Sequence, residues 1–265
     1  VRVPWVVVGA GLTGLSSAQR LAELHPDDEI ILLDARLVGQ GASGRNSGFA
    51  VGVSHFPGKF QPDQTVNFAR INRINQAGLD ILDQNINTLA IDCQWDNNGF
   101  HHGAADTASV NEQKNFITYL NAMEVEHSSL DQQVMHARFG TTLYQAGVHV
   151  NRGALVQPAA LVRGLADGLP SNVKLVENCP VLKLHPGNTL RLQIFNGEIT
   201  TDKLIMATNY EAPKLGFLRG RLIGSTLSGS FTRILTEQEL ASLGSHKNWG
   251  IISLHGGGAT LRLTK

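Results

Sequence analysis

A short set of residues near the N-terminus has the types and the spacing to hold the phosphates and ribose of a dinucleotide. Gly9, Gly11 and Gly14 form the pattern GxGxxG, and Asp34 follows twenty residues after the last glycine. The first glycine can make a tight turn, the second lets a pyrophosphate approach the backbone, and the third lets a helix pack closely. A carboxylate at Asp34 can accept two hydrogen bonds from a ribose diol, and it would repel a ribose 2′-phosphate.

The elements on either side of these glycines support a dinucleotide site over an ordinary glycine turn. The apolar run 6–8 predicts a strand, residues 12–24 predict a helix with one apolar face, and 29–33 predict a second strand that ends at Asp34. The free N–H groups and the dipole of the helix N-terminus attract phosphate. The residues expected to contact the dinucleotide are Gly9, Ala10, Gly11, Leu12, Thr13, Gly14 and Asp34. NAD and FAD are held in the same way, so this motif leaves both open.

Composition narrows the class of protein. With 265 residues the chain can bury the core of one large or two modest domains. The 22 Lys and Arg balance the 22 Asp and Glu, so no basic surplus indicates nucleic acid or an anionic membrane. No apolar segment approaches the ~20 residues that span a bilayer. The first strand begins almost at Val1, so we expect no signal peptide and a cytoplasmic protein. Cys93 and Cys179 are expected to be free thiols.

A glycine-rich loop follows Asp34. Residues 39–48 read GQGASGRNSG, a composition that excludes a strand or a stable helix and suits close backbone approach to a ligand. Arg45 can offer a forked guanidinium to a phosphate or to an electron-rich flavin edge, while Ser43 and Asn46 supply neutral donors. A flexible surface linker is the alternative.

Two stretches together resemble a known family: VVVGAGLTGLSSAQRLAE and LLDARLVGQGASGRNSG. They are similar to the FAD-dependent amine and amino-acid oxidase superfamily, which includes D-amino-acid, glycine and sarcosine oxidases, and GASGRNSG is most similar to the γ-glutamylputrescine-oxidase-like branch. The resemblance implies FAD, with this loop running past the pyrophosphate toward the flavin. Where some relatives carry a histidine bonded covalently to flavin, this chain has Arg45, so non-covalent FAD is implied. The contacts so implied are those of Ala35, Arg36, Ala42, Ser43, Arg45, Asn46 and Ser47.

A third motif lies at residues 204–209, LIMATN, where a buried strand ends in small residues. Such an end lets the sheet edge pass close beneath a cofactor, although an ordinary strand end would look the same. The resemblance implies that Ala207, Thr208 and Asn209 contact FAD, and that the backbone around Val181 contacts the adenine.

The remaining pattern alternates helices and strands. Asp63, Ser129 and Thr236 are expected helix N-caps, with Glu239 completing a capping box, and Asn98–Gly99 predicts a hairpin. Helices are expected at 63–87, 111–123, 133–139, 158–169 and 236–243. Strands are expected at 144–150, 173–176, 181–184, 189–195, 200–208, 226–234 and 250–254.

Several polar and aromatic residues have chemistry that could serve a function, but their spacing does not indicate a site. His55 is expected to be a solvated loop residue. His101 and His102 are adjacent on a predicted strand, so they point to opposite faces and do not suit a shared metal ion. The residues expected to be structural although they could face a pocket are Trp249, His255 and Arg262.

These features predict a Rossmann-like α/β FAD-binding domain at 1–88 and 151–213. A discontinuous α+β substrate domain on an antiparallel sheet is expected at 89–150 and 214–265. The resemblance implies that family members continue past residue 265, so the C-terminal part is expected to be missing from this sequence.

The function that follows is FAD-dependent oxidation of the carbon–nitrogen bond of a small amine or amino acid to an imine, with oxygen or another acceptor reoxidising the flavin. An NAD-dependent dehydrogenase and a non-catalytic FAD-binding subunit of a larger oxidase are the alternatives. The sequence leaves the catalytic residues and the oligomeric state open.

Overall fold

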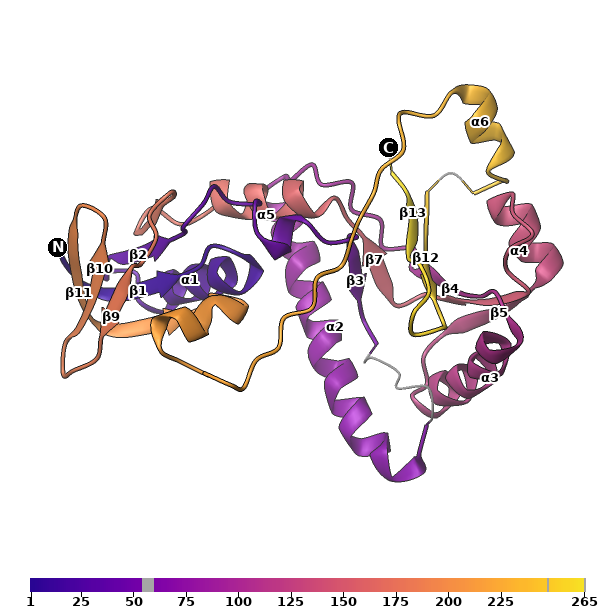
Figure 1. The fold of residues 1–265 in the computed structure, drawn as a ribbon, viewed down its shortest axis with the longest axis horizontal. Coiled ribbons are helices and arrows are strands. Elements are labelled where there is room, and N and C mark those ends of the chain that lie inside the picture. The colour runs from indigo at the N-terminus through magenta and orange to yellow at the C-terminus, as the bar shows by residue number, and fades with distance from the viewer. Residues whose placement is uncertain (54–59, 247, 265) are drawn as a thin grey trace. The chain divides into compact units, whose positions relative to one another are not determined.

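The computed structural model describes residues 1–53, 60–246 and 248–264 (Figure 1), so His55 lies outside the described residues. The chain separates into two compact units, which we describe one at a time. The first unit is Val1–Asn46, Asn85–Cys93 and Pro158–Ser228, and the second is Ser47–Gln84, Gln94–Gln157 and Gly229–Lys265.

The first unit is built on a six-stranded sheet in the order β8-β2-β1-β11-β10-β9. The first four strands are parallel, as in a Rossmann-like domain, and β10 pairs antiparallel with both β11 and β9. β2 is apolar and buried along its whole length, and the neighbouring β1 buries its last three residues, Val6, Val7 and Val8. The strands are β1 (Arg2–Val8), β2 (Ile30–Leu33), β8 (Val173–Val176), β9 (Lys183–His185), β10 (Leu190–Ile194) and β11 (Gly197–Met206).

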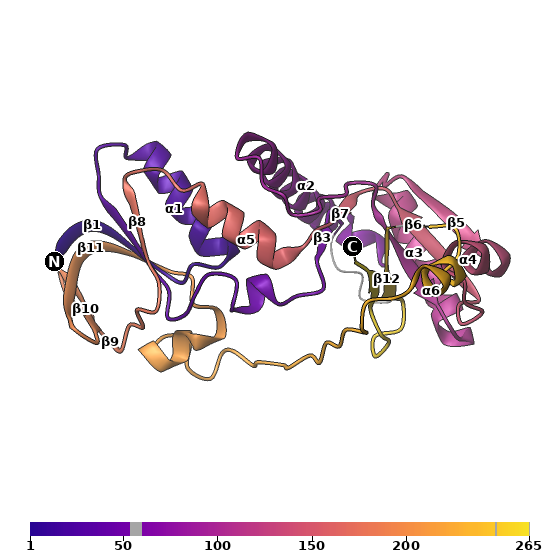
Figure 2. The ribbon, with the colours of Figure 1, turned by 90° about the horizontal axis from the view of Figure 1, so that it is seen from above.

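Helix α1 (Leu12–Leu24) packs against this sheet, and α5 (Pro158–Asp167) packs against α1, beside which Figure 2 shows it. The observed α1 has the predicted bounds. It buries Gly14, Leu15, Ala18 and Ala22, the small and apolar face that its spacing predicts. Short 3₁₀ turns occur at η1 (Ala42–Gly44) and η3 (Asn209–Leu215).

The second unit contains a five-stranded sheet in the order β13-β12-β4-β6-β5. The pair β12–β4 is parallel and the other neighbours are antiparallel, so the sheet is mixed where an antiparallel one was expected. A separate antiparallel pair joins β3 to β7. The strands are β3 (Phe49–Val51), β4 (Phe100–Ala104), β5 (His127–Asp131), β6 (Ala146–Val150), β7 (Gly153–Leu155), β12 (Trp249–Ser253) and β13 (Leu261–Leu263).

Aromatic side chains fill the core of the second unit. Phe68, on the long helix α2, packs edge-on against Tyr119 with ring centroids 5.3 Å apart, and Asn72 hydrogen-bonds the Tyr119 hydroxyl at 3.3 Å. This packing ties part of the segment Ser47–Gln84 to the rest of the second unit. The helical elements are η2 (Pro62–Gln64), α2 (Thr65–Thr88), α3 (Thr107–Ala122), α4 (Gln132–Phe139) and α6 (Glu237–Ser242).

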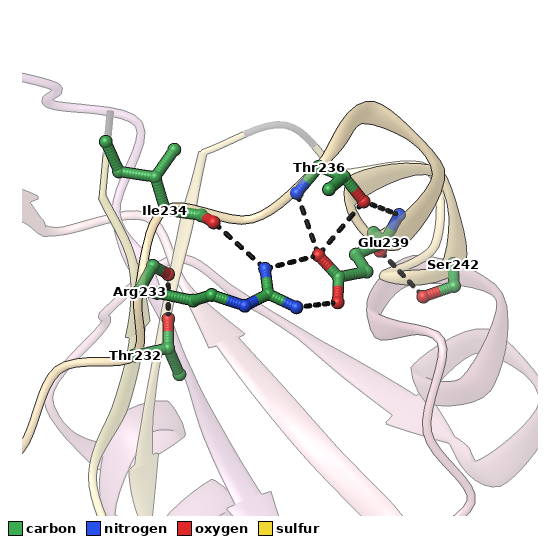
Figure 3. A network of polar contacts seen from close by, with 6 residues as sticks. All are labelled: Thr232, Arg233, Ile234, Thr236, Glu239 and Ser242. Atoms are coloured by element: carbon green, nitrogen blue, oxygen red, sulfur yellow. Dashed lines mark hydrogen bonds and ion pairs between the residues drawn. The ribbon is translucent and has the colours of Figure 1, made fainter.

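Helix capping corrects two predictions and confirms a third. Ser129 is not a cap, because it lies within β5; Asp131 caps α4 and accepts a hydrogen bond from Val134 N at 2.8 Å. Asp63 lies inside η2 and does not cap α2. Thr236 caps α6 as predicted, with the Glu239 carboxylate accepting from Thr236 N and from Arg233 (Figure 3).

Two strand predictions were wrong. Asn98–Gly99 does not join a hairpin, since β4 pairs with β6 and β12 instead, and Asp96 forms an isolated bridge to Leu155. Residues 226–234 form no strand in the described chain; Leu227, Phe231 and Ile234 are 90–93% exposed. An alternating pattern needs a neighbouring strand to accept its hydrogen bonds, and the described residues provide none there. Within the described residues, no helix is both long and apolar enough to cross a membrane.

Candidate cofactor site

The turn between β1 and α1 requires glycine at positions 9 and 14. Gly9 has a φ of 103° and donates from its N to Leu33 O at 2.7 Å. A Cβ on Gly9 would lie 2.5 Å from Ala207 O, and a Cβ on Gly14 would lie 1.7 Å from Gly9 O. The turn therefore closes directly against the end of β11, and the first and third glycines have the structural roles that the pattern predicts.

The N-terminus of α1 is open to an anion. Gly11 is the N-cap, its side chain is absent, and the first helical turn holds no acidic residue. Leu12 N donates to Ser43 Oγ at 3.1 Å, and a Cβ on Gly11 would lie 2.7 Å from that oxygen. Ser43, which the sequence assigned to a separate loop, is thus held at the helix N-terminus, where Thr13 is exposed.

Asp34 lies at the carboxyl end of β2 and fixes the same turn. Its Oδ2 accepts a hydrogen bond from Ala10 N at 2.8 Å, and its Oδ1 accepts from Arg36 N at 2.9 Å. Each carboxylate oxygen keeps a second lone pair for another donor. Asp34 O also accepts from Cys179 N at 2.8 Å, which draws the segment leading to Val181 beside Asp34.

Val181 itself lies before β9 and packs partly buried against the apolar core of the sheet, whereas a strand was predicted to begin there. Ala35 and Arg36 follow Asp34 on the exposed side of the first unit. Cys179, two residues before Val181, is hydrogen-bonded to Asp34, and Ala35 and Arg36 follow Asp34 directly in the chain.

The glycine-rich loop is ordered by its own side chains. Asn46 Nδ2 donates to Ser43 O at 2.9 Å and to Ala42 O at 3.2 Å. Arg45 is exposed. Ser47 belongs to the second unit, where its carbonyl accepts from Arg262 Nη1 at 3.3 Å. The loop is therefore not a structureless linker, and its two ends are anchored in different units.

At the end of β11, Ala207 N donates to Val8 O at 2.8 Å, which continues the pairing of β11 with β1. The next residue, Thr208, has a buried Oγ1 with no hydrogen-bond partner among the described residues. Asn209 has a φ of 51°, a left-handed conformation that asparagine tolerates better than most residues. A ligand passing over this strand end would supply the partner that the Thr208 hydroxyl lacks.

These observations fit an anionic dinucleotide. An open helix N-terminus, glycines without side chains in the way, an acidic residue beside the turn and an unpartnered hydroxyl all occur in the first unit. The carboxylate of Asp34 favours a ribose with free hydroxyls over one that carries a 2′-phosphate.

His101 and His102 point to opposite sides of β4, as a strand requires. The His101 ring lies 4.6 Å from His149 and 5.4 Å from His246, and Arg138 Nη1 lies 3.3 Å from His101 Nε2. Burial, followed by these neighbouring rings and the Arg138 charge, lowers the pKa of His101 to about 3. Among the described residues, no group of three His, Cys, Asp or Glu side chains could hold a metal ion.

His102 packs against Phe116 on the other side, with ring centroids 4.6 Å apart, and burial lowers its pKa to about 4. Both β4 histidines are therefore neutral near pH 7.

The second unit also contains a cavity of about 490 Å³. Trp95, Arg152 and four carboxylates line it, and Trp95 Nε1 donates to one of them, Asp83 Oδ1, at 2.8 Å. No residue expected to contact the cofactor lines this cavity. Trp249 is buried in the second unit, and the His255 imidazole accepts a hydrogen bond from Gly257 N at 3.1 Å, so neither faces the cavity.

A Rossmann-like sheet with an open glycine turn, joined to a second unit on a mixed sheet, defines a dinucleotide-dependent class of protein. The sequence profile of the FAD dependent oxidoreductase family matches residues 4–262. The chain therefore belongs to this family of FAD-dependent oxidoreductases.

Two curated relatives are similar in sequence. The γ-glutamylputrescine oxidoreductase of Escherichia coli (strain K12) is 29% identical over 209 residues, and a probable oxidoreductase OrdL of Haemophilus influenzae is 27% identical over 219 residues. Each alignment covers 77% of this chain and 48% of the relative. The chain thus spans about half the length of these relatives.

Solved structures share the fold at low identity. Glycine oxidase from Geobacillus kaustophilus has a TM-score of 0.68 at 17% identity, covering 83% of this chain and 58% of that chain. L-proline dehydrogenase from P. horikoshii has a TM-score of 0.68 at 17% identity, covering 99% of this chain and 67% of that one. At this identity the likeness establishes the fold alone.

Proposed function

We propose that this chain forms the FAD-binding part of an oxidoreductase that converts the carbon–nitrogen single bond of an amine or amino acid to an imine. The observation that carries the proposal is the convergence of Gly11, Ser43, Asp34 and Thr208 in one unit, within a family that uses FAD. The names of relatives, which include a γ-glutamylputrescine oxidoreductase, support an amine or amino-acid substrate.

The N-terminus of α1 would hold the FAD pyrophosphate. Backbone groups of Gly9, Ala10, Gly11, Leu12, Thr13 and Gly14 provide this surface. Asp34 would accept hydrogen bonds from the adenosine ribose without giving up its contacts to Ala10 N and Arg36 N, because each oxygen has a second lone pair. Ala35, Arg36 and Val181 would border the adenosine.

The loop and the end of β11 would continue the site toward the flavin. Ser43, ordered against α1, and the exposed Arg45 would border the phosphates or the ring edge, while Asn46 keeps Ala42 and Ser43 in place. Thr208 Oγ1 would bond the cofactor, with Ala207 and Asn209 on either side. When bound, FAD supplies the electron sink for the substrate's hydride equivalent. We infer non-covalent attachment, because Arg45 stands where covalently linked relatives carry a histidine.

The 265-residue chain, purified and stripped of flavin, tests the cofactor half of this proposal. FAD should raise the unfolding temperature and NAD should not, and acid precipitation should release the flavin into the supernatant. Protection by NAD alone would favour a nicotinamide-dependent dehydrogenase, and flavin that stays with the precipitate would overturn non-covalent attachment.

The substrate half needs the whole protein. Anaerobic addition of glycine, sarcosine, D-amino acids and polyamine conjugates should bleach the two visible flavin bands with at least one amine. A protein that holds FAD but is bleached by none of them, while dithionite still reduces it, would favour a non-catalytic FAD-binding subunit.

A further inference from the structure

Arg262, on the edge strand β13, holds the end of the glycine-rich loop. Its Nη1 donates to Ser47 O at 3.3 Å, to Gly48 O at 3.2 Å and also to Val156 O. These three carbonyls belong to segments more than one hundred residues from Arg262 in sequence. One guanidinium group therefore joins the loop end to the chain that follows β7.

The backbone at this point is shaped around the guanidinium. Gly48 has a φ of 76°, and a Cβ on Gly48 would lie 1.9 Å from Arg262 Nη1 and 2.1 Å from Val156 O. Gly48 O also accepts from Val156 N at 2.9 Å, directly before the β3–β7 ladder begins at Phe49 and Leu155. Glycine is thus required at 48 both for its conformation and for the close approach of Arg262.

The Arg262 charge is committed to these backbone groups. No described carboxylate lies within ion-pair distance of it, although the Asp96 charge acts on it from further away. Its Nε is buried without a partner. A desolvated guanidinium on three carbonyls is a costly arrangement that a surface arginine does not need. The bonds to Ser47 O and Gly48 O, which fix the end of the loop, offset this cost.

We propose that Arg262 is a positioning residue for the cofactor site: it fixes Ser47 and Gly48, and thereby the loop segment expected to border the flavin. This inference rests on the proposed FAD site, because only then does the position of Ser47 matter to a ligand. Arg262 acts through the loop backbone and is not a catalytic residue.

The test compares Arg262→Gln and Arg262→Lys with a matched control, Arg233→Gln. Arg233 is also in the second unit and also donates to a backbone carbonyl, that of Ile234, but its other partner is the exposed Glu239 (Figure 3). Two quantities are measured: the FAD dissociation constant from flavin fluorescence, and the rate at which trypsin cleaves the apo-protein after Arg45. The second measures loop anchoring without any cofactor.

We expect Arg262→Gln to weaken FAD binding about tenfold and to speed cleavage after Arg45 about tenfold, the scale of a lost charged hydrogen-bond network. Arg262→Lys, which keeps a donor cation, should recover most of both values, and the Arg233→Gln control should change each less than twofold. The bound-flavin absorption bands should also shift in Arg262→Gln, which a general loss of stability would not cause.

Unchanged cleavage after Arg45 in Arg262→Gln would overturn the positioning role whether or not FAD binds. Faster cleavage with unchanged FAD affinity would show that the loop end is anchored but does not serve the cofactor, which also overturns it. A parent chain that binds no FAD contradicts the proposed function separately, before any variant is made. If Arg262→Gln fails to fold, Arg262→Met, which keeps the apolar part of the side chain and removes every donor, is judged by the same criteria.

Discussion

The two units of this chain position polar groups in different ways. In the first unit, the candidate site is made of backbone atoms and small side chains from 9–14 and 43, with Asp34 bonded to Ala10 N and Arg36 N. In the second unit, His101 meets His149, His246 and Arg138, which four separate segments bring together. The comparison teaches that the glycine turn and the acid that ends the next strand can be found from their spacing. The hydrogen bond of Ser43 to Leu12 N and the cluster around His101 depend on the fold and cannot be found in this way.

The largest effect is expected at Gly14, where one added methyl group should strongly destabilise the first unit. A Cβ there would lie 1.7 Å from Gly9 O, so Gly14→Ala should lower the free energy of unfolding by about 3–5 kcal/mol. Chemical denaturation of the apo-protein measures this. The matched control is Gly41→Ala, because a Cβ at Gly41 meets nothing within 4 Å and its φ is −89°; an equal loss in both variants would contradict the close-packing argument.

Low pH should destabilise the second unit through His101 and His102. The folded-state pKa values of His101 and His102, about 3 and about 4, lie below the usual 6.5. The unfolded chain therefore binds more protons below pH 6.5, and stability present above that pH is lost as the pH falls toward 4. From pH 7 to pH 5, each of the two histidines should lower the free energy of unfolding by about 2 kcal/mol.

Urea unfolding at both pH values checks the acid prediction, with His102→Phe as the variant and the exposed His136→Gln as its control. The phenylalanine should reduce the pH dependence and the control should not. Equal pH dependence in the parent and His102→Phe would mean that the ring is accessible to protons in the folded state.

Asp34 should contribute both to ligand binding and to the stability of the turn in the first unit. Asp34→Ala should weaken FAD binding by about 1–3 kcal/mol, the scale of lost charged hydrogen bonds. It also removes the acceptors of Ala10 N and Arg36 N, so the apo-protein should be less stable too. Asp34→Asn, which keeps one acceptor oxygen, should fall between the parent and Asp34→Ala in FAD titrations. Unchanged affinity in both variants would remove Asp34 from the site.

The smallest effect tests a local feature of the second unit. Thr236→Ala removes the N-cap of α6 and should cost about 1 kcal/mol of stability, with no change in FAD affinity. Thermal unfolding and FAD titration of one sample measure both quantities. A weaker affinity for FAD in Thr236→Ala would contradict the purely local role of this cap.

Sequence alone predicted most of the first unit. The bounds of α1 match residue for residue, and the strands that carry the glycine turn and LIMATN are where their apolar runs indicate. These elements depend on local spacing and on glycine conformation. Even the correct cap at Thr236 is local, because the capping box lies within four residues.

The wrong predictions of caps and strands concern residues whose structure depends on a partner that is distant in sequence. Ser129 and Asp131 are both good caps, and the pairing of β5 with β6 takes Ser129 into a strand. Residues 226–234 alternate like a strand but have no partner among the described residues. Nothing near Arg262 in sequence indicates that it would bind carbonyls at Ser47 and Gly48, more than 200 residues away.

The central claim is that the glycine turn, Ser43, Asp34 and Thr208 together bind FAD. The most direct measurement is gel filtration of the purified 265-residue chain after incubation with FAD, recording the visible spectrum of the protein peak for the parent and for Thr208→Val. The account predicts two flavin bands eluting with the parent in near one-to-one amount, and less flavin with Thr208→Val. A parent peak without flavin absorbance at saturating FAD would contradict it.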